Sequence, residues 1–201
     1  LPGEVAMMHF DIKRTLWAWW ERGERLSPRD ILESFLQALG PAGTLLVPLF
    51  NWDFCKGIPF DIRSSPSQTG AVSEAVRLHP GVQRTPHPLY SFGAFGALAP
   101  RFCALETLTA FGPDSPFQLL RDVGGKLVNL DVCGFTFYHH VEHMEKAEYR
   151  YHKPFTATYI DASGSGRPVT VSMFVRDLER GVEPYFPMNE LLWKEGLLHG
   201  D

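Results

Sequence analysis

Short apolar segments and helical stripes alternate along the first 150 residues. Segments 4–9, 43–50, 92–98 and 126–133 consist mainly of apolar and small residues, which is typical of strands in a covered sheet. Apolar residues spaced three and four apart predict helices between them, at 28–39, 71–77 and 116–120. This alternation indicates an α/β sheet with helices packed on it.

Local signals set the ends of several of these elements. Ser27 and Pro28 are typical of a helix start, and Gly40 followed by Pro41 is typical of a helix end. Segment 51–70 is rich in Asn, Asp, Ser, Pro and Gly, and we expect a long functional loop there. We also expect a loop at 11–14, directly after the first strand.

The pattern changes after residue 150. Two strand-like segments, 155–160 and 168–175, flank the turn at 164–166 and predict an antiparallel hairpin. The predicted fold is therefore an α/β/α sandwich with a mixed, mostly parallel central sheet, to which the hairpin adds antiparallel strands. No repeat or linker divides residues 1–201, so we expect a single domain.

Composition narrows the range of functions. The net charge of −4, without a basic stripe, argues against nucleic acid, and no apolar run approaches a membrane span. No secretory signal is evident. The three dispersed cysteines, Cys55, Cys103 and Cys133, favour reduced thiols and a cytoplasmic protein. Apolar segments that look exposed are compatible with a homodimer.

Segment 136–143 (TFYHHVEH) holds the densest group of reactive side chains. In a helix over 136–149, His139 and Glu142 share one face, because they are three residues apart. A carboxylate beside an imidazole fixes its tautomer and raises its basicity, so the pair can take a proton from an attacking amine.

Two other interpretations fit the same segment. His139 and His143 could ligate zinc while Glu142 activates water, with a third ligand from a glutamate further downstream. Alternatively, the histidines are hydrogen-bonded groups with a structural role at a helix start. The residues of this segment alone do not decide between these chemistries.

Five segments, in order, resemble the aminoglycoside 3-N-acetyltransferase family over about residues 5–150. Three further segments resemble the members of that family found in surface-glycan gene clusters, which acylate amino sugars. Compared with the family, the chain looks short at both ends. The five family segments are 43–48 (GTLLVP), 67–77 (SQTGAVSEAVR), 84–91 (RTPHPLYS), 111–116 (FGPDSP) and 136–142 (TFYHHVE); the three others are 51–57, 66–70 and 149–153.

The resemblance implies an N-acyltransferase that moves an acyl group from acetyl-CoA or another acyl-CoA to the primary amine of an amino sugar. His139 then matches the catalytic base and Glu142 its partner, whereas His143 becomes incidental and no metal is expected. The residues expected to contact CoA are His9, Asp11, Lys13, Thr69, Gly70, His87, Ser91 and Thr136. In the loop of His9 and Asp11 the family usually has His-Ser-Ser, and the two serines are absent here.

Charged residues near the long loop are the candidates for binding the acceptor. A polycationic aminoglycoside needs an acidic cleft, whereas a nucleotide sugar needs Arg and Lys. The loop carries both signs, which mildly favours a nucleotide-linked amino sugar. The alternatives are an aminoglycoside-inactivating enzyme, a zinc hydrolase, and a binding protein without catalysis. The expected acceptor-binding residues are Asp53, Lys56, Arg63, Glu74 and Arg84.

Overall fold

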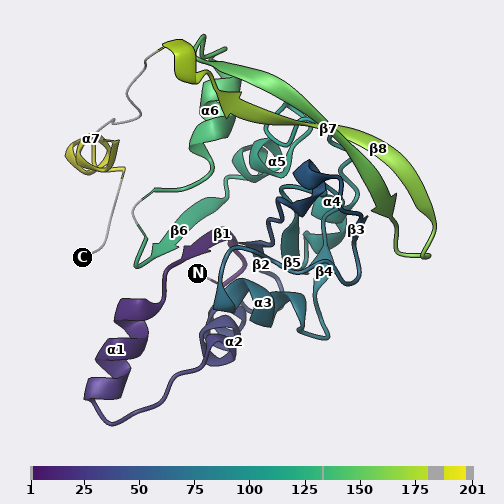
Figure 1. Cartoon of the computed structure of the whole chain (residues 1–201). Helices are drawn as coiled ribbons and strands as arrows, with labels where there is room; N and C mark the ends of the chain where they lie inside the picture. The colour runs from purple at the N-terminus through teal and green to yellow at the C-terminus, as the bar shows by residue number, and fades with distance from the viewer. Residues whose placement is uncertain (1, 133, 181–187, 198–201) are drawn as a thin grey trace.

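A central sheet of five strands organises the structure, a computed structural model that describes residues 2–132, 134–180 and 188–197 (Figure 1). The strand order is β4-β5-β2-β1-β6. β1 lies parallel to β2 and β6, while β5 lies antiparallel to β2 and β4, so only β5 runs against the other strands of this sheet. The strands are β1 (Val5–Phe10), β2 (Thr44–Pro48), β4 (Gln83–Arg84), β5 (Phe92–Gly96) and β6 (Lys126–Leu130).

Both faces of this sheet are covered, which explains why its strands are apolar at successive positions. In β1, Val5 and Met7 belong to one apolar cluster, and Ala6 and Met8 belong to the other. Because side chains alternate along a strand, the two sets point to opposite faces.

Helices α2 (Pro28–Leu39) and α3 (Ala71–Arg77) cover one face. The start of α2 is fixed by a capping box, in which the Ser27 hydroxyl accepts from the Asp30 amide and the Asp30 carboxylate accepts from the Ser27 amide. Gly40 follows the last turn at φ 66°. The sequence predicted both helices with these bounds.

The other face carries α4 (Ala99–Cys103), α5 (Pro116–Asp122) and a second sheet of order β3-β7-β8. β7 (Arg150–Ile160) and β8 (Gly166–Arg176) form the predicted hairpin, and β3 (Phe60–Asp61) pairs with β7. The layered α/β prediction is confirmed, with one correction. The hairpin does not join the central sheet; β5 makes that sheet mixed.

Two further predictions about elements were wrong, and the long loop proved partly structured. Lys13 does not lie in a loop but begins helix α1 (Lys13–Glu21). α1 buries no residue, and its Trp17 and Trp20 stay exposed. Helix α6 spans only Tyr138–Met144, because Lys146 adopts φ 53° and turns the chain toward β7. The long loop contains a 3-10 turn, η1 (Asp53–Lys56), as well as β3.

The remaining described elements are η2 (Leu178–Arg180) and α7 (Met188–Lys194). Among the described helices none is long and apolar enough to cross a bilayer. Cys55 and Cys103 are free thiols, and Cys133 lies outside the described residues.

Substituting Gly96 tests how closely β5 packs on the chain that leads into β2. A Cβ on Gly96 would lie 1.9 Å from the Gly43 carbonyl oxygen, whereas a Cβ on Gly57 meets nothing within 4 Å, and both glycines have positive φ. We expect Gly57→Ala to cost about 1–2 kcal/mol from backbone strain. We expect Gly96→Ala to cost about 1–3 kcal/mol more, because β2 must shift. Urea unfolding measures both, and equal losses would contradict this close approach.

Candidate functional site

The imidazole of His139 and the carboxylate of Glu142 meet on α6, as the spacing predicted. His139 Nδ1 lies 2.7 Å from Glu142 Oε2. Because an ionised carboxylate can only accept, Nδ1 carries the hydrogen and Nε2 keeps a lone pair. The His139 side chain is one-third exposed, so a substrate can reach the imidazole that carries this lone pair.

Glu142 also contacts two residues at the start of the hairpin. The Tyr149 hydroxyl donates to Glu142 Oε1 at 2.9 Å, and Arg150 Nε forms an ion pair with Oε2 at 2.7 Å. The exposed fraction of the Glu142 side chain is 19% and that of Arg150 is 13%, so water screens this contact only partly. Both carboxylate oxygens are therefore engaged.

The surroundings shift both pKa values downward. Burial lowers the pKa of His139, the Arg150 charge lowers it further, and the bond to Glu142 opposes both. Burial raises the pKa of Glu142, but its contacts with His139, Arg150 and Tyr149 outweigh burial and lower it overall. At neutral pH the pair is thus an ionised carboxylate and a neutral imidazole.

Two contacts fix α6 beneath this pair. His140 is buried, and its Nδ1 lies 2.8 Å from the Phe111 carbonyl oxygen. The Phe111 ring also meets the His139 ring edge-on at 5.4 Å. Phe111 belongs to segment 111–116, which leads into α5, so the apolar layer beneath the sheet positions the imidazole.

His143 packs against the hairpin. Its ring contacts the rings of His152 at 5.1 Å and Phe174 at 5.4 Å, on the hairpin. No three His, Cys, Asp or Glu side chains among the described residues are grouped to hold a metal ion. The Arg150 cation on Glu142 also opposes a metal there, so the zinc interpretation gains no support from the geometry.

The loop after β1 brings His9 close to the start of α6. The Thr136 amide points toward His9 Nε2 at 3.5 Å. Burial lowers the pKa of His9 to about 4, which keeps the ring neutral. Asp11 and Lys13 are exposed and pair weakly with each other, at 3.9 Å. His9 and Thr136 are therefore near the pair on α6, while Asp11 and Lys13 lie at the beginning of α1.

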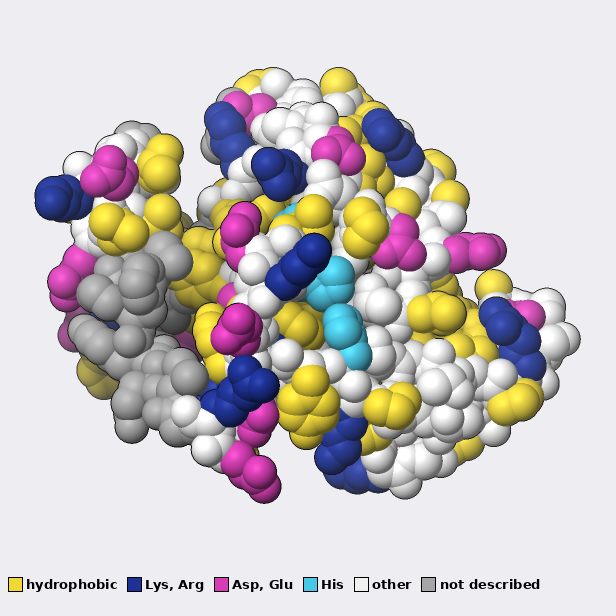
Figure 2. Space-filling model, turned by 90° about the horizontal axis from the view of Figure 1, so that it is seen from above, with side chains coloured by type: hydrophobic (Ala, Val, Ile, Leu, Met, Phe, Trp, Pro, Cys, Tyr) yellow, Lys and Arg dark blue, Asp and Glu magenta, His cyan; other side chains and the backbone are white. Residues whose placement is uncertain are grey.

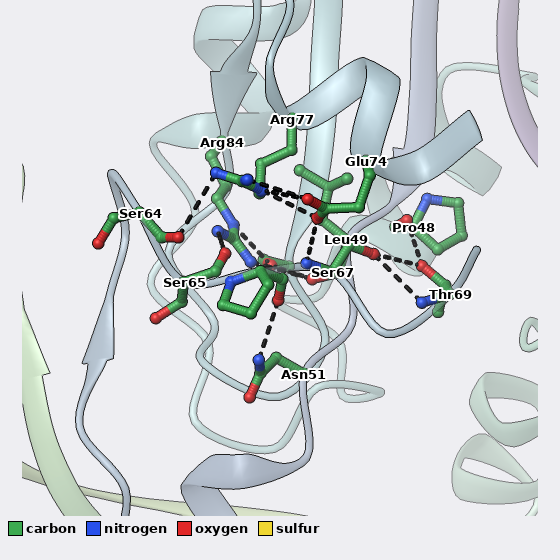
Figure 3. A network of polar contacts seen from close by, with 12 residues as sticks. Pro48, Leu49, Asn51, Ser64, Ser65, Ser67, Thr69, Glu74, Arg77 and Arg84 are labelled. Atoms are coloured by element: carbon green, nitrogen blue, oxygen red, sulfur yellow. Dashed lines mark hydrogen bonds and ion pairs between the residues drawn. The ribbon is translucent and has the colours of Figure 1, made fainter. Parts of the chain in front are cut away.

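Several other predicted residues, Arg84, Ser91, Glu74 and Thr69, belong to a separate polar network at β2 and α3 (Figure 3). Arg84 donates to the Ser65 and Leu49 carbonyls and to the Ser91 hydroxyl, at 2.6 to 3.0 Å, and its guanidinium lies 4.7 Å from the Phe60 ring centre. Burial lowers its pKa to about 10, so it stays charged at neutral pH. Arg84 thereby ties the long loop to the sheet.

Glu74 and Thr69 complete that network. Glu74 forms a two-pronged ion pair with Arg77 and accepts from the Ser67 amide. The Thr69 hydroxyl donates to the Pro48 carbonyl at 2.8 Å. Gly70, at φ 112°, precedes α3, a conformation that favours glycine. Figure 3 shows the side chains of Glu74, Arg77 and Arg84 pointing toward one another. Their polar groups form hydrogen bonds or ion pairs with other groups of the protein.

The last four predicted residues, His87, Asp53, Lys56 and Arg63, also have partners. His87 is buried, and its Nδ1 accepts from the Leu89 and Tyr90 amides. Within the loop, Lys56 pairs with Asp53 at 2.9 Å and Arg63 pairs with Asp61 at 2.7 Å. The charges of the long loop therefore neutralise each other locally.

The sequence prediction missed three residues near the pair. Tyr149 and Arg150 were noted only within segment 149–153, with no role at Glu142. Asn129 of β6 is the register partner of His9, and Asn129 Oδ1 and His9 Nδ1 are both buried without a hydrogen-bond partner among the described residues. The alternation of buried residues along β1 and β6 could have placed Asn129 beside His9.

Comparison with known proteins identifies the family of this chain. The sequence model of aminoglycoside 3-N-acetyltransferase matches residues 7–198. The chain belongs to the aminoglycoside 3-N-acetyltransferase family. It is similar to aminoglycoside N(3)-acetyltransferase IV from Salmonella sp., with 30% identity over 153 residues, which cover 74% of this chain and 55% of the relative.

Solved members of the family share the fold. Aminoglycoside acetyltransferase AAC(3)-Xa superposes with a TM-score of 0.80 at 25% identity, over 98% of this chain and 77% of that structure. AAC-IIIb, solved as a binary complex with CoASH, gives 0.77 at 22% identity, over 97% and 80%. The chain spans about half the length of the curated family members it matches.

Arg84 offers a test of how the long loop is held. Arg84→Met removes the donors to Leu49, Ser65 and Ser91, and we expect a loss of about 2–3 kcal/mol with faster proteolysis within 51–70. Arg63→Met is the matched control, because its ion pair is half exposed, and we expect a far smaller loss. Denaturant unfolding and timed proteolysis measure the two effects. Equal behaviour of the variants would contradict a clamping role for Arg84.

Proposed function

We propose that this chain carries the active site of an N-acyltransferase that moves an acyl group, such as acetyl, from acyl-CoA to the primary amine of an amino sugar. The observation that supports it most is the neutral His139 imidazole, whose Nδ1–H is held by the ionised Glu142. Membership of the acetyltransferase family supports the reaction class.

In this mechanism His139 acts as the general base. An amine is mostly protonated at neutral pH, and only its free base attacks a thioester. As the amine nitrogen bonds to the thioester carbonyl carbon, His139 Nε2 takes the proton and the carbon–sulfur bond then breaks. The leaving thiolate needs no covalent enzyme intermediate. The hydroxyl of Thr136, at the start of α6, is a candidate donor to the transient oxyanion.

The residues near His139 fit the pantetheine arm of CoA, whose amides both donate and accept hydrogen bonds. His9 Nδ1 and Asn129 Oδ1 are a buried donor and acceptor without a partner among the described residues. Bound acyl-CoA supplies the activated thioester, and His9, Asn129 and Thr136 would hold its arm. Ser91, Thr69, Gly70 and His87 belong to the tightly bonded layer that would shape the channel wall, and Asp11 and Lys13 lie where that channel would open.

The acceptor we favour is a nucleotide-linked amino sugar. Asp53 and Asp61 are each neutralised by a neighbouring cation, so the loop offers no acidic cleft for a polycation. On the face in Figure 2, acidic and basic side chains are interspersed around central histidines. The alternative acceptor is an aminoglycoside, with antibiotic resistance as the outcome, and the similarity to the Salmonella enzyme favours it. We also propose that the protein works in the cytoplasm, where acyl-CoA is made, and forms a homodimer.

Replacing His139 tests the mechanism. We expect His139→Ala to lower kcat about 10²- to 10⁴-fold at saturating substrates, because the general base is lost. His143→Ala is the control, and we expect it to keep most activity, whereas a zinc enzyme would lose it. Thiol release from acetyl-CoA measures turnover. Wild-type turnover by His139→Ala would exclude this role.

A second measurement separates the acceptors. Thiol release should give a higher kcat/KM with a nucleotide-linked amino sugar than with an aminoglycoside, because the described loop lacks unpaired acids. Expression in a sensitive bacterial strain should then leave its aminoglycoside tolerance unchanged. The reverse order of kcat/KM, together with raised tolerance, would establish the alternative.

A further inference from the structure

Two residues that precede or begin β7 hold the carboxylate of Glu142 from outside its own helix. The Tyr149 hydroxyl donates to Oε1, while Arg150 Nε and His139 Nδ1 share Oε2, each at 2.7 Å. A glutamate side chain on a helix of seven residues has several rotamers available. Contacts at both oxygens select the one that faces His139.

The hairpin in turn fixes Arg150. One of its terminal nitrogens donates to the Phe174 carbonyl at 3.3 Å, and the guanidinium lies 5.6 Å from the Phe174 ring centre. Phe174 belongs to β8 and is buried. Arg150 thus bridges the paired strands of the hairpin and the carboxylate on α6, and it is held at both ends.

We propose that Arg150 and Tyr149 are positioning residues for acyl transfer, which hold Glu142 against His139 and keep the imidazole neutral and oriented until the amine reaches it. This inference rests on the proposed function. Neither residue is placed to touch the reacting atoms, so both act through Glu142.

The charges around His139 give Arg150 a second effect. Glu142 faces the imidazole from α6 and Arg150 faces it from β7, while Phe111 faces it from the α5 side with an uncharged ring. The unit charges of Glu142 and Arg150 oppose each other. A carboxylate alone would favour the imidazolium, and the guanidinium offsets this preference. The proton taken from the amine therefore leaves His139 readily for the thiolate or water.

Removing the guanidinium should change the pKa of His139 in one direction only. Without the positive charge the protonated imidazole is favoured, so the pKa of His139 rises, and the acid limb of kcat/KM moves to higher pH. A base that is protonated at neutral pH cannot take up the amine proton. We expect Arg150→Met to lower kcat/KM at pH 7 about 10- to 100-fold, because a shift of one pKa unit corresponds to a factor of about ten and the ion pair that orients Glu142 is lost as well.

The experiment compares four variants of the full chain by two measurements. NMR titration of the histidine ring signals, with His139→Ala to assign the His139 signal, follows protonation without any need for turnover. Thiol release from acetyl-CoA gives kcat/KM against pH. Arg150→Met and Tyr149→Phe each remove one contact that holds Glu142. Arg150→Lys keeps the positive charge without the planar guanidinium. Arg176→Met is the matched control, because Arg176 is the register partner of Arg150 on β8.

We expect Arg150→Met to raise both the pKa of His139 in the NMR titration and the pH of the acid limb of kcat/KM. Arg150→Lys should bring both values most of the way back to those of the wild type. Tyr149→Phe should lower kcat about threefold to tenfold with little change of KM, since it removes one hydrogen bond. Arg176→Met should match the wild type. Superimposable His139 titrations for wild type and Arg150→Met, with unfolding curves that show both folded, would overturn the proposal.

Failure of the proposed function gives a different result. In that case the wild-type chain releases no thiol with any amine tested, yet its His139 titration still responds to Arg150→Met. Should Arg150→Met fail to fold, Arg150→Lys and Tyr149→Phe still decide the matter. Wild-type kcat in both of these variants would overturn the positioning role.

Discussion

Burial of the central sheet on both faces is the constraint from which the other features follow. β1 and β2 have no face left for water, so residues such as Met7, Met8, Leu45 and Leu46 are fully buried. Helices α2 and α3 satisfy one face, and α4, α5 and the second sheet satisfy the other. The chain must therefore place its polar chemistry at the strand ends, where the loops after β1, β2 and β6 leave the sheet.

Those loops are ordered by charge rather than by apolar packing alone. The partly buried Arg84 cation donates to the Ser65 carbonyl of the long loop and to the Leu49 carbonyl after β2, and the Glu74–Arg77 pair holds the segment that leads into α3. A cation in such a place is stable because its donors are bonded to fixed oxygens. The same rule operates at Glu142, where the partners of the carboxylate are an imidazole, a phenol and a guanidinium. Two polar networks of similar construction thus hold the long loop and the His139–Glu142 pair.

Local signals in the sequence were sufficient for part of this structure. The Ser27 cap, the glycine after α2 and the spacing of His139 and Glu142 each act over a few residues, and each was predicted. The path of the hairpin was not, because its packing on η1 and β3 depends on contacts far apart in the sequence, such as Phe60 with Tyr159. Arg150 was missed for a different reason: its partner Glu142 is close in sequence, but the turn that brings them together has Lys146 at positive φ, where a glycine would have signalled it. Asp53, Arg63 and Arg84 were assigned to the acceptor from charge alone, and charge does not reveal that each already has a partner.

The hairpin has a register of eleven residue pairs, from Arg150 with Arg176 to Ile160 with Gly166. Successive residues on a strand point to opposite faces, so a slip of β7 by one position would present Tyr151 to Glu142 and turn the guanidinium outward. In the proposed mechanism, the orientation of the His139 imidazole therefore depends on the correct pairing of the hairpin. A molecule with β7 shifted by one position would keep its sheet, its helices and its histidine, yet Glu142 would lack its guanidinium partner.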